Sequence, residues 1–253
     1  MKSNEIFSVL NGYAPLKLSY DFQKMIDGYD NSGVLADVDG EVKGVLFTLD
    51  LTEACVQFAK DNGCNLIVTH HPAIYAPIKS IDGALRKCIN CGIGIISMHL
   101  NVDVASEGID YHLANGLGAT EQKIIYDLGD GCGYGRIFYK NATAGEIKNE
   151  YIKVFETENA MLFGNADTKI KKIASFCGSG LDIKEIDLSS EADLLVSSDI
   201  KHHVILYALE KGKCVLNVSH YSSEAYGFKK YYKIVKEKLV GLNCVFYENA
   251  QML

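Results

Sequence analysis

Histidine and carboxylate side chains recur in this chain at places where an apolar run ends. His70 and His71 close the run 64–69 and are followed at once by Pro72. A short apolar run bounded by proline is typical of a buried strand, and open parallel sheets bind ligands at the carboxyl ends of their strands. The sequence therefore predicts two imidazoles, each a neutral nitrogen ligand, at such an edge. The alternative is a turn that happens to contain two histidines.

Further groups of metal-ligand type follow two more runs of this kind. Asp103 comes after the run 93–98, and His220 and Glu224 come after the run 214–218. Because His220 and Glu224 are four residues apart at the start of a predicted helix, their side chains leave the same face of that helix. Three imidazoles and two carboxylates suit zinc, iron, manganese or nickel and argue against calcium. The candidate metal ligands are His70, His71, Asp103, His220 and Glu224.

The number of candidate ligands indicates more than one ion. Five ligands exceed the four of a tetrahedral shell and fall short of closing two shells. A bridging carboxylate resolves the count, with two ions roughly 3.5–4 Å apart that each keep an open position for water or substrate. Single residues have simpler explanations, since Asp103 could be a helix N-cap and Glu224 a first-turn glutamate favoured by the helix dipole. One shared site explains all five positions together.

The other four histidines are weaker candidates. His202 and His203 occupy the first turn of a predicted helix, and either is a candidate catalytic acid or base because imidazole titrates near neutral pH. The alternative is a helix-start pair with one ring packed and one in solvent. His99 is predicted to hold Asp103 in place rather than to bind metal itself. His112 lies inside a predicted helix and is given no role.

Two further motifs invite a chemical interpretation. Cys88 and Cys91 form a lone C-x-x-C, which lacks the second pair of a zinc site and lies late in a predicted helix, so we expect structural cysteines. The segment 177–180, Cys-Gly-Ser-Gly, follows a predicted strand. It is compatible with a backbone nest for an anion, although a tight turn is the simpler interpretation.

The elements that must position these residues alternate between strand and helix. Asp50 and Glu53 form a capping-box signature for a helix that runs to Asp61. A glycine-rich segment at 129–135, predicted to be flexible, separates two stretches of this alternation, which indicates parallel sheets. Strands are predicted at 42–49, 64–69, 93–98, 136–140, 160–164, 173–177, 192–197, 214–218 and 242–247. Helices are predicted at 50–61, 83–91, 109–117, 144–155, 201–210 and 222–239.

Composition excludes several classes of protein. The chain is 48% apolar and 23% charged, values typical of a globular protein. The net charge is −7 and the densest basic patch holds only Lys169, Lys171 and Lys172, so we expect no nucleic-acid partner. No segment reads as a signal peptide or a membrane span, and most cysteines lie in apolar runs. We therefore expect a cytoplasmic protein that contacts no membrane.

Several segments together resemble the motifs of one family. The sequence is similar to the dinuclear metal-centre family of GTP cyclohydrolase I type 2 homologues, also called Nif-three-like proteins. The likeness covers nearly the whole chain, and the His-His-Pro and His-Tyr-x-x-Glu pieces in this order are specific. The segments that carry it are 30–35, 48–52, 66–72, 99–103, 201–203 with Gly212, and 220–224.

The resemblance implies an arrangement of the ligands. His71 and Asp103 would hold the first of two divalent ions, and His70 and His220 the second, with Glu224 bridging. It also implies two related α/β lobes with mostly parallel sheets, a metal site in the cleft between them, and a toroidal homohexamer. We assign 1–104 plus 220–253 to lobe one and 105–219 to lobe two.

The function implied by the resemblance is metal-dependent hydrolysis of a small molecule, with a purine nucleotide as the candidate substrate. The alternative is a metal-binding, metal-delivery or regulatory protein without turnover. The chain departs from the family at Ser197-Ser198-Asp199, where the family commonly has Thr-Gly followed by an acid. That departure leaves the role of Asp199 open.

Overall fold

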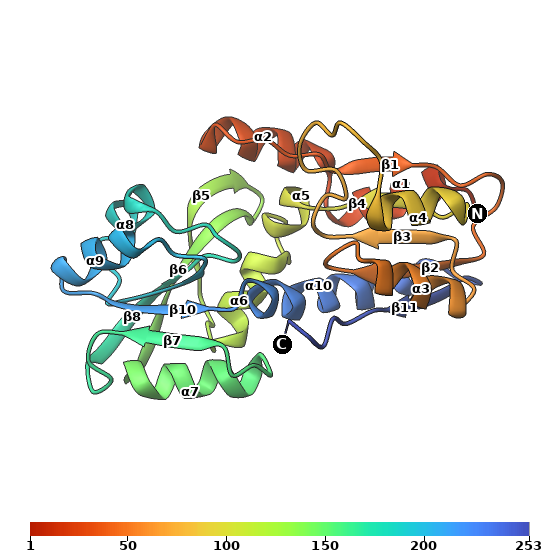
Figure 1. Ribbon diagram of the computed structural model, residues 1–253. Coiled ribbons are helices and arrows are strands. Elements are labelled where there is room, and N and C mark those ends of the chain that lie inside the picture. Colours follow the sequence, from red (N-terminus) through yellow and green to blue (C-terminus); the bar gives the residue numbers. More distant parts are fainter. Residues whose placement is uncertain (253) are drawn as a thin grey trace. The chain divides into compact units, whose positions relative to one another are not determined.

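Two sheets, each with its own helices, make up the computed structural model, which describes residues 1–252 (Figure 1). Unit 1 comprises Met1–Ala105 and Phe228–Glu248, and unit 2 comprises Ser106–Gly227 and the residues from Asn249 onward. Strands and helices alternate along most of the chain, so the predicted α/β class is confirmed.

The sheet of unit 1 is mostly parallel, as predicted. Its strand order is β1-β4-β3-β2-β11, and only β1 runs antiparallel to its neighbour. The strands are β1 (Gly33–Ala36), β2 (Gly44–Thr48), β3 (Leu66–Thr69), β4 (Gly94–Ser97) and β11 (Asn243–Phe246). The helices that belong wholly to this unit are α1 (Ser3–Tyr13), α2 (Leu16–Ile26), α3 (Glu53–Asp61), α4 (Gly83–Asn90) and α5 (Leu100–Asp103).

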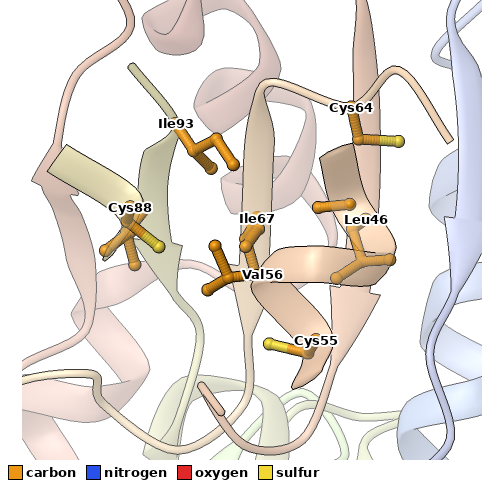
Figure 2. Packing of buried hydrophobic residues seen from close by; sticks show 9 residues of the cluster. Leu46, Cys55, Val56, Cys64, Ile67, Cys88 and Ile93 are labelled. Atoms are coloured by element: carbon orange, nitrogen blue, oxygen red, sulfur yellow. The ribbon is translucent and has the colours of Figure 1, made fainter. Parts of the chain in front are cut away.

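The two faces of this sheet bury different residues because side chains alternate along a strand. Leu46 and Ile67 point to one face, where they pack with Val56 of α3 and Cys88 of α4 (Figure 2). Phe47, next in sequence to Leu46, packs on α10 residues of the other face, with its ring centroid 6.5 Å from that of Phe228 and 5.1 Å from that of Tyr232. Burial on both faces fixes where β2 and β3 end, and so where the residues after them lie.

The sheet of unit 2 is mixed, so the prediction of a mostly parallel sheet is wrong for this unit. Its strand order is β5-β6-β8-β9-β10-β7. Neighbours pair in parallel from β8 to β9 and from β9 to β10, and the other three pairings are antiparallel. The strands are β5 (Lys123–Gly129), β6 (Cys132–Thr143), β7 (Ala160–Phe163), β8 (Lys169–Ser175), β9 (Leu194–Ser198) and β10 (Cys214–Val218). The helices are α6 (Ile109–Gly116), α7 (Ala144–Val154), α8 (Ile183–Leu188), α9 (His202–Glu210) and the start of α10 (His220–Lys236).

The glycine-rich segment 129–135 is an ordered hairpin rather than a flexible linker. It forms the turn between β5 and β6 and the first residues of β6. Gly135 has a φ of +73°, and a Cβ there would lie 2.6 Å from the Phe176 ring. Glycine is therefore required by local packing, because a side chain would both strain the backbone and overlap a neighbour.

The boundary between the units falls inside α10, after Gly227. The sequence prediction instead placed the whole of 220–253 in lobe one. The first turns of α10 are tied to unit 2 by side-chain hydrogen bonds. Ser222 Oγ lies 2.9 Å from Tyr151 Oη, and Ser223 Oγ accepts from the backbone N–H of Gly178 at 3.1 Å. His220 and Glu224 therefore belong to unit 2.

Most predicted elements are present with small shifts at their ends. β10 spans the predicted 214–218, and α10 begins at His220 rather than at 222. The strand β1 was not predicted because its apolar run, 34–36, is only three residues long, and the structure leaves Val34 41% exposed. None of the helices within residues 1–252 is both long and apolar enough to cross a membrane.

Candidate metal centre

Three histidines of unit 1 gather where two parallel strands end. His70 and His71 follow β3, and His99 is the N-cap of α5, just after β4. Since β3 and β4 are parallel neighbours, their carboxyl ends share one edge of the sheet. Each ring offers one nitrogen, and these nitrogens lie within 4.8 Å of one another. The predicted position of His70 and His71 at a strand end is confirmed.

The buried ring of His70 is held by the backbone. Its Nδ1 lies 2.9 Å from the carbonyl oxygen of Met98. Because a carbonyl oxygen only accepts, Nδ1 carries the hydrogen, and the lone pair that a metal ion takes is on Nε2. That Nε2 lies 3.5 Å from Asp103 Oδ1, and the Asp103 side chain is 7% exposed. Asp103 is the last residue of α5 and caps no helix, so its N-cap alternative is excluded.

The ring of His71 is held by a carboxylate. Its Nδ1 donates to Asp50 Oδ1 at 2.7 Å, which again leaves the lone pair on Nε2. The sequence predicted Asp50 as the N-cap of a helix, and this is wrong. Thr52 caps α3 instead, since its hydroxyl accepts from the Cys55 N–H at 3.1 Å. Asp50 therefore orients the ring of His71 and does not cap α3.

The ring of His99 is held by a second carboxylate. Its Nδ1 lies 2.8 Å from Asp30 Oδ1. That the ring also holds Asp103 stays a prediction. Burial acts to raise the pKa of Asp30, but hydrogen bonds from His99, Ser19 and Ser32 outweigh it and bring the pKa to about 2. A carboxylate so firmly ionised is a strong acceptor for the His99 N–H.

Unit 2 contributes the pair His220 and Glu224 at the start of α10, as predicted. His220 Nδ1 lies 2.6 Å from Asp199 Oδ2, and its Nε2 lies 2.9 Å from Glu224 Oε1. The Glu224 side chain is 4% exposed. The role of Asp199 that the sequence left open is therefore to hold the His220 ring.

One pattern is common to the four imidazoles. In each, Nδ1 is bonded to a carbonyl or carboxylate oxygen, so the lone pair of the neutral, metal-binding form of the ring is on Nε2. Metal-ligating histidines in proteins show this arrangement almost always, because the second bond fixes the tautomer and the ring orientation. The four residues are His70, His71, His99 and His220.

The distances and burial also suit a divalent metal ion. Two ligand atoms about 2.0–2.1 Å from one ion lie roughly 2.9–3.4 Å apart for angles between a right angle and a tetrahedral one. His220 Nε2 and Glu224 Oε1 are 2.9 Å apart, which lies within this range. A cation would also offset the cost of burying the two carboxylates. The residues present fit such an ion.

Comparison with known proteins places the chain in a family. Residues 1–252 match the model of the family described as Duf34/NIF3 (NGG1p interacting factor 3). The chain belongs to the Duf34/NIF3 family. The resemblance seen in the sequence is thereby confirmed.

Members of Duf34/NIF3 match this chain along most of its length. A Clostridium perfringens relative named GTP cyclohydrolase 1 type 2 homolog is 32% identical over 251 residues, covering 94% of this chain and 93% of its own. NGG1-interacting factor 3 of Saccharomyces cerevisiae is 29% identical and covers 80% of this chain and 81% of its own. Among solved structures, a Staphylococcus aureus protein has a TM-score of 0.85 at 24% identity, covering 100% of this chain and 98% of its own. HcgD from Methanocaldococcus jannaschii has a TM-score of 0.81 at 26% identity, with 98% of both chains covered.

The catalytic candidates of this Duf34/NIF3 chain lie on α9 of unit 2. His202 and His203 are exposed in the first turn of this helix, as predicted. His112 lies on α6 beside Tyr111, with ring centroids 5.2 Å apart. The acid–base role of His202 or His203 stays a prediction.

The cysteines of this family member fit a structural role. Cys88 is fully buried in the core of unit 1 (Figure 2). Cys91 is the C-cap of α4. Burial raises the pKa of the Cys88 thiol to about 12, with smaller contributions from Cys55 and Cys91. A thiol so hard to ionise is a poor nucleophile and a poor metal ligand.

The sequence did not reveal the partners of the rings. Asp50 follows the predicted strand 42–49 in the same way that Asp103 follows 93–98, so the signal that found Asp103 could have found it. Asp30 carried a weaker signal, because it lies in one of the family-like segments but follows no apolar run. Asp199 was singled out only through its departure from the family pattern.

Proposed function

We propose that this chain binds two divalent metal ions and acts as a metal-dependent hydrolase. His71 and Asp103 would hold the first ion, and His70 and His220 the second, with Glu224 serving both. This assignment of ligands is the one that the family resemblance implies. The donor set of imidazole and carboxylate accepts zinc, iron, manganese or nickel.

The observation that supports this proposal best is the shared hydrogen-bond pattern of the imidazoles. Each Nδ1 is bonded to an acceptor that orients the ring, and each Nε2 carries the lone pair. A core or turn histidine has no need of this pattern, since either nitrogen can satisfy it. The pattern occurs in every proposed imidazole ligand, namely His70, His71 and His220.

The catalytic part of the proposal assigns roles to this chain's own groups. Bound ions would lower the pKa of a coordinated water and polarise the substrate. Asp50 and Asp199 orient the rings of His71 and His220. His202 or His203 accepts or donates the proton, as an imidazole can do near neutral pH.

The substrate and the setting are proposed on the family resemblance. The name of the Clostridium perfringens relative points to a purine nucleotide as the small-molecule substrate. Because the chain has a net charge of −7, the metal ions would have to supply the positive charge that attracts phosphate. We propose a cytoplasmic homohexamer, which light scattering on the purified protein tests directly.

Metal analysis tests the ligand assignment. We expect the purified wild-type protein, loaded with zinc, to carry two ions per chain, and the variants His71→Ala and Glu224→Ala to carry fewer. His203→Ala is the control, because this exposed imidazole is no ligand in the proposal and its loss should leave the metal content unchanged. Full metal content in both ligand variants would overturn the assignment. A wild-type protein that takes up none of the four metals would overturn metal binding itself.

A hydrolysis screen tests the catalytic part separately. The substrates are nucleotides, phosphoesters and cyclic amides, each offered to metal-loaded protein and to protein treated with chelator. We expect turnover of at least one substrate that the chelator abolishes. Metal-loaded protein that hydrolyses none of them would refute the hydrolase and leave a metal-binding or metal-delivery protein.

A further inference from the structure

We propose that the turn at Cys177–Gly178 is a backbone clamp that holds Glu224 and His220 in their ligand orientation. The buried pair of Asp110 and Arg136 anchors this turn, so both act as positioning residues. The inference rests on the proposed function only in taking Glu224 and His220 as metal ligands. All the residues concerned belong to unit 2.

Gly178 lies close to the proposed ligand atoms of both Glu224 and His220. A Cβ on Gly178 would overlap Glu224 Oε1 and would lie 3.4 Å from His220 Nε2. The residue also has a φ of +58°, a conformation that side chains other than glycine's rarely adopt. The backbone at this position thus closes directly against the carboxylate and the imidazole, and any side chain here would displace them.

Hydrogen bonds to both the N–H and the carbonyl oxygen of Gly178 fix its position. Its N–H donates to Ser223 Oγ at 3.1 Å, and Ser223 is the residue before Glu224. Its carbonyl oxygen accepts from Ser197 Oγ at 3.0 Å and from the Ser198 N–H at 3.0 Å. The turn is therefore bound both to the end of β9 and to the first turn of α10.

The buried pair of Asp110 and Arg136 anchors the turn at Cys177. The N–H of Cys177 donates to Asp110 Oδ1 at 3.1 Å, and Arg136 Nε donates to Asp110 Oδ2 at 3.2 Å. Asp110 is fully buried and Arg136 is 2% exposed. Arg136 Nη2 in turn donates to the carbonyl oxygen of Gly133 at 3.0 Å.

A buried ion pair of this kind is poor evidence of a gain in stability, since desolvation offsets much of the attraction. Its geometric effect is clearer. Both oxygens of Asp110 have a directed donor, so the carboxylate cannot rotate without breaking a buried hydrogen bond, and this fixes the N–H of Cys177. Loss of a group that is bonded to a metal ligand and orients it typically lowers metal affinity about 10–100-fold. We expect a change of that size.

A pair of glycine variants tests the clamp. Gly178→Ala adds a methyl group against the two ligand atoms. Gly212→Ala is the matched control, because Gly212 also has a positive φ, +74°, but nothing within 4 Å of the position of the added Cβ. Zinc affinity is measured by competition with a chromophoric chelator, and melting of the chelator-treated proteins reports their stability. We expect zinc affinity to fall by about tenfold or more in Gly178→Ala and to stay near the wild-type value in Gly212→Ala.

A second variant keeps the inference testable if Gly178→Ala does not fold. Asp110→Asn retains the shape of the side chain and one acceptor oxygen, but it removes the charge that faces Arg136. We expect weaker zinc binding and a shifted visible spectrum of the cobalt-substituted protein, because the ligand field changes when Glu224 moves. A purely structural role for Asp110 would lower stability and leave that spectrum as in the wild type.

The outcomes separate the inference from the proposed function. A wild-type protein that binds no metal overturns both. A wild-type protein that binds metal, with Gly178→Ala and Asp110→Asn showing the same affinity and cobalt spectrum, overturns the clamp alone. Equal losses of affinity in Gly178→Ala and Gly212→Ala would assign the effect to backbone strain and would also overturn it.

Discussion

Removing the carboxylate of Asp50 tests whether His71 is a metal ligand without touching any proposed ligand. Asp50 Oδ1 accepts the hydrogen bond from His71 Nδ1 at 2.7 Å, and both side chains are partly exposed, at 35% and 26%. Because both side chains are partly exposed, substitution of Asp50 should leave the core of unit 1 intact. Asp50→Ala removes the acceptor and lets the ring change both its orientation and its tautomer.

The expected loss follows from the type of bond. Substituting a group that orients a metal-ligating histidine costs about 10–100-fold in metal affinity, or about 1.4–2.7 kcal/mol. Asp50→Asn keeps an oxygen that accepts from Nδ1 and loses only the charge. Because charge-assisted hydrogen bonds are about twice as strong as neutral ones, we expect about half of that free energy, or about 3–10-fold.

The assay is zinc titration against a chromophoric chelator for the wild type and for both variants. Asp61→Ala is the matched control, since Asp61 is another exposed carboxylate of unit 1 and accepts a hydrogen bond from the Gln57 side chain at 2.9 Å. We expect affinity to fall in the order wild type, Asp50→Asn, Asp50→Ala. If Asp50→Ala binds zinc as tightly as Asp61→Ala, His71 is not a ligand whose orientation matters, and the assignment of the first ion is refuted.

Three further predictions follow from other parts of the molecule. His202→Ala should keep the metal content of the wild type and lose hydrolytic activity, and unchanged activity would exclude this ring as the acid or base. Phe47→Ala should lower the free energy of unfolding by about 3–5 kcal/mol, measured by urea denaturation, because the fully buried ring leaves a cavity beside Phe228. Cys88 should resist alkylation near pH 8, where a pKa of about 12 leaves roughly one thiol in ten thousand ionised, whereas the part-exposed Cys132 should react. Mass spectrometry of the labelled protein distinguishes the two cysteines.

The sequence could point to the candidate ligands because they come after buried strands. Apolar runs at 64–69, 93–98 and 214–218 mark three strand ends, and β3, β4 and β10 lie within or at those runs. Residues just after such strands are fixed by the sheet, so their identity alone indicated a site. The same reasoning does not require knowledge of the strand order.

The carboxylates that bond the histidine rings could not be predicted, because their positions depend on the strand order. Asp50 lies beside His71 because β2 and β3 pair in parallel, from Val45 with Leu66 to Thr48 with Thr69. From sequence alone, the Asp50-x-x-Glu53 spacing fits a capping box equally well, although Thr52 provides the cap in the structure.

The mixed sheet of unit 2 escaped prediction for a related reason. The short runs that become β6, β7 and β8 carry no mark of strand direction, and β7 pairs antiparallel with β10 although it precedes β8 in the chain. A pattern of apolar residues indicates that a strand exists. It does not indicate with which neighbouring strand the strand will pair, or in which direction.

The two units share one motif that positions a histidine. In unit 1, Asp50 follows β2 and bonds His71, which follows the parallel neighbour β3, with α3 between the two strands. In unit 2, Asp199 follows β9 and bonds His220, which follows the parallel neighbour β10, with α9 between them. Each unit thus uses one strand–helix–strand motif to place an aspartate beside a histidine at the same sheet edge. Because parallel pairing sets that distance, the fold itself fixes which nitrogen of each ring carries the hydrogen, and in both units the lone pair is on Nε2.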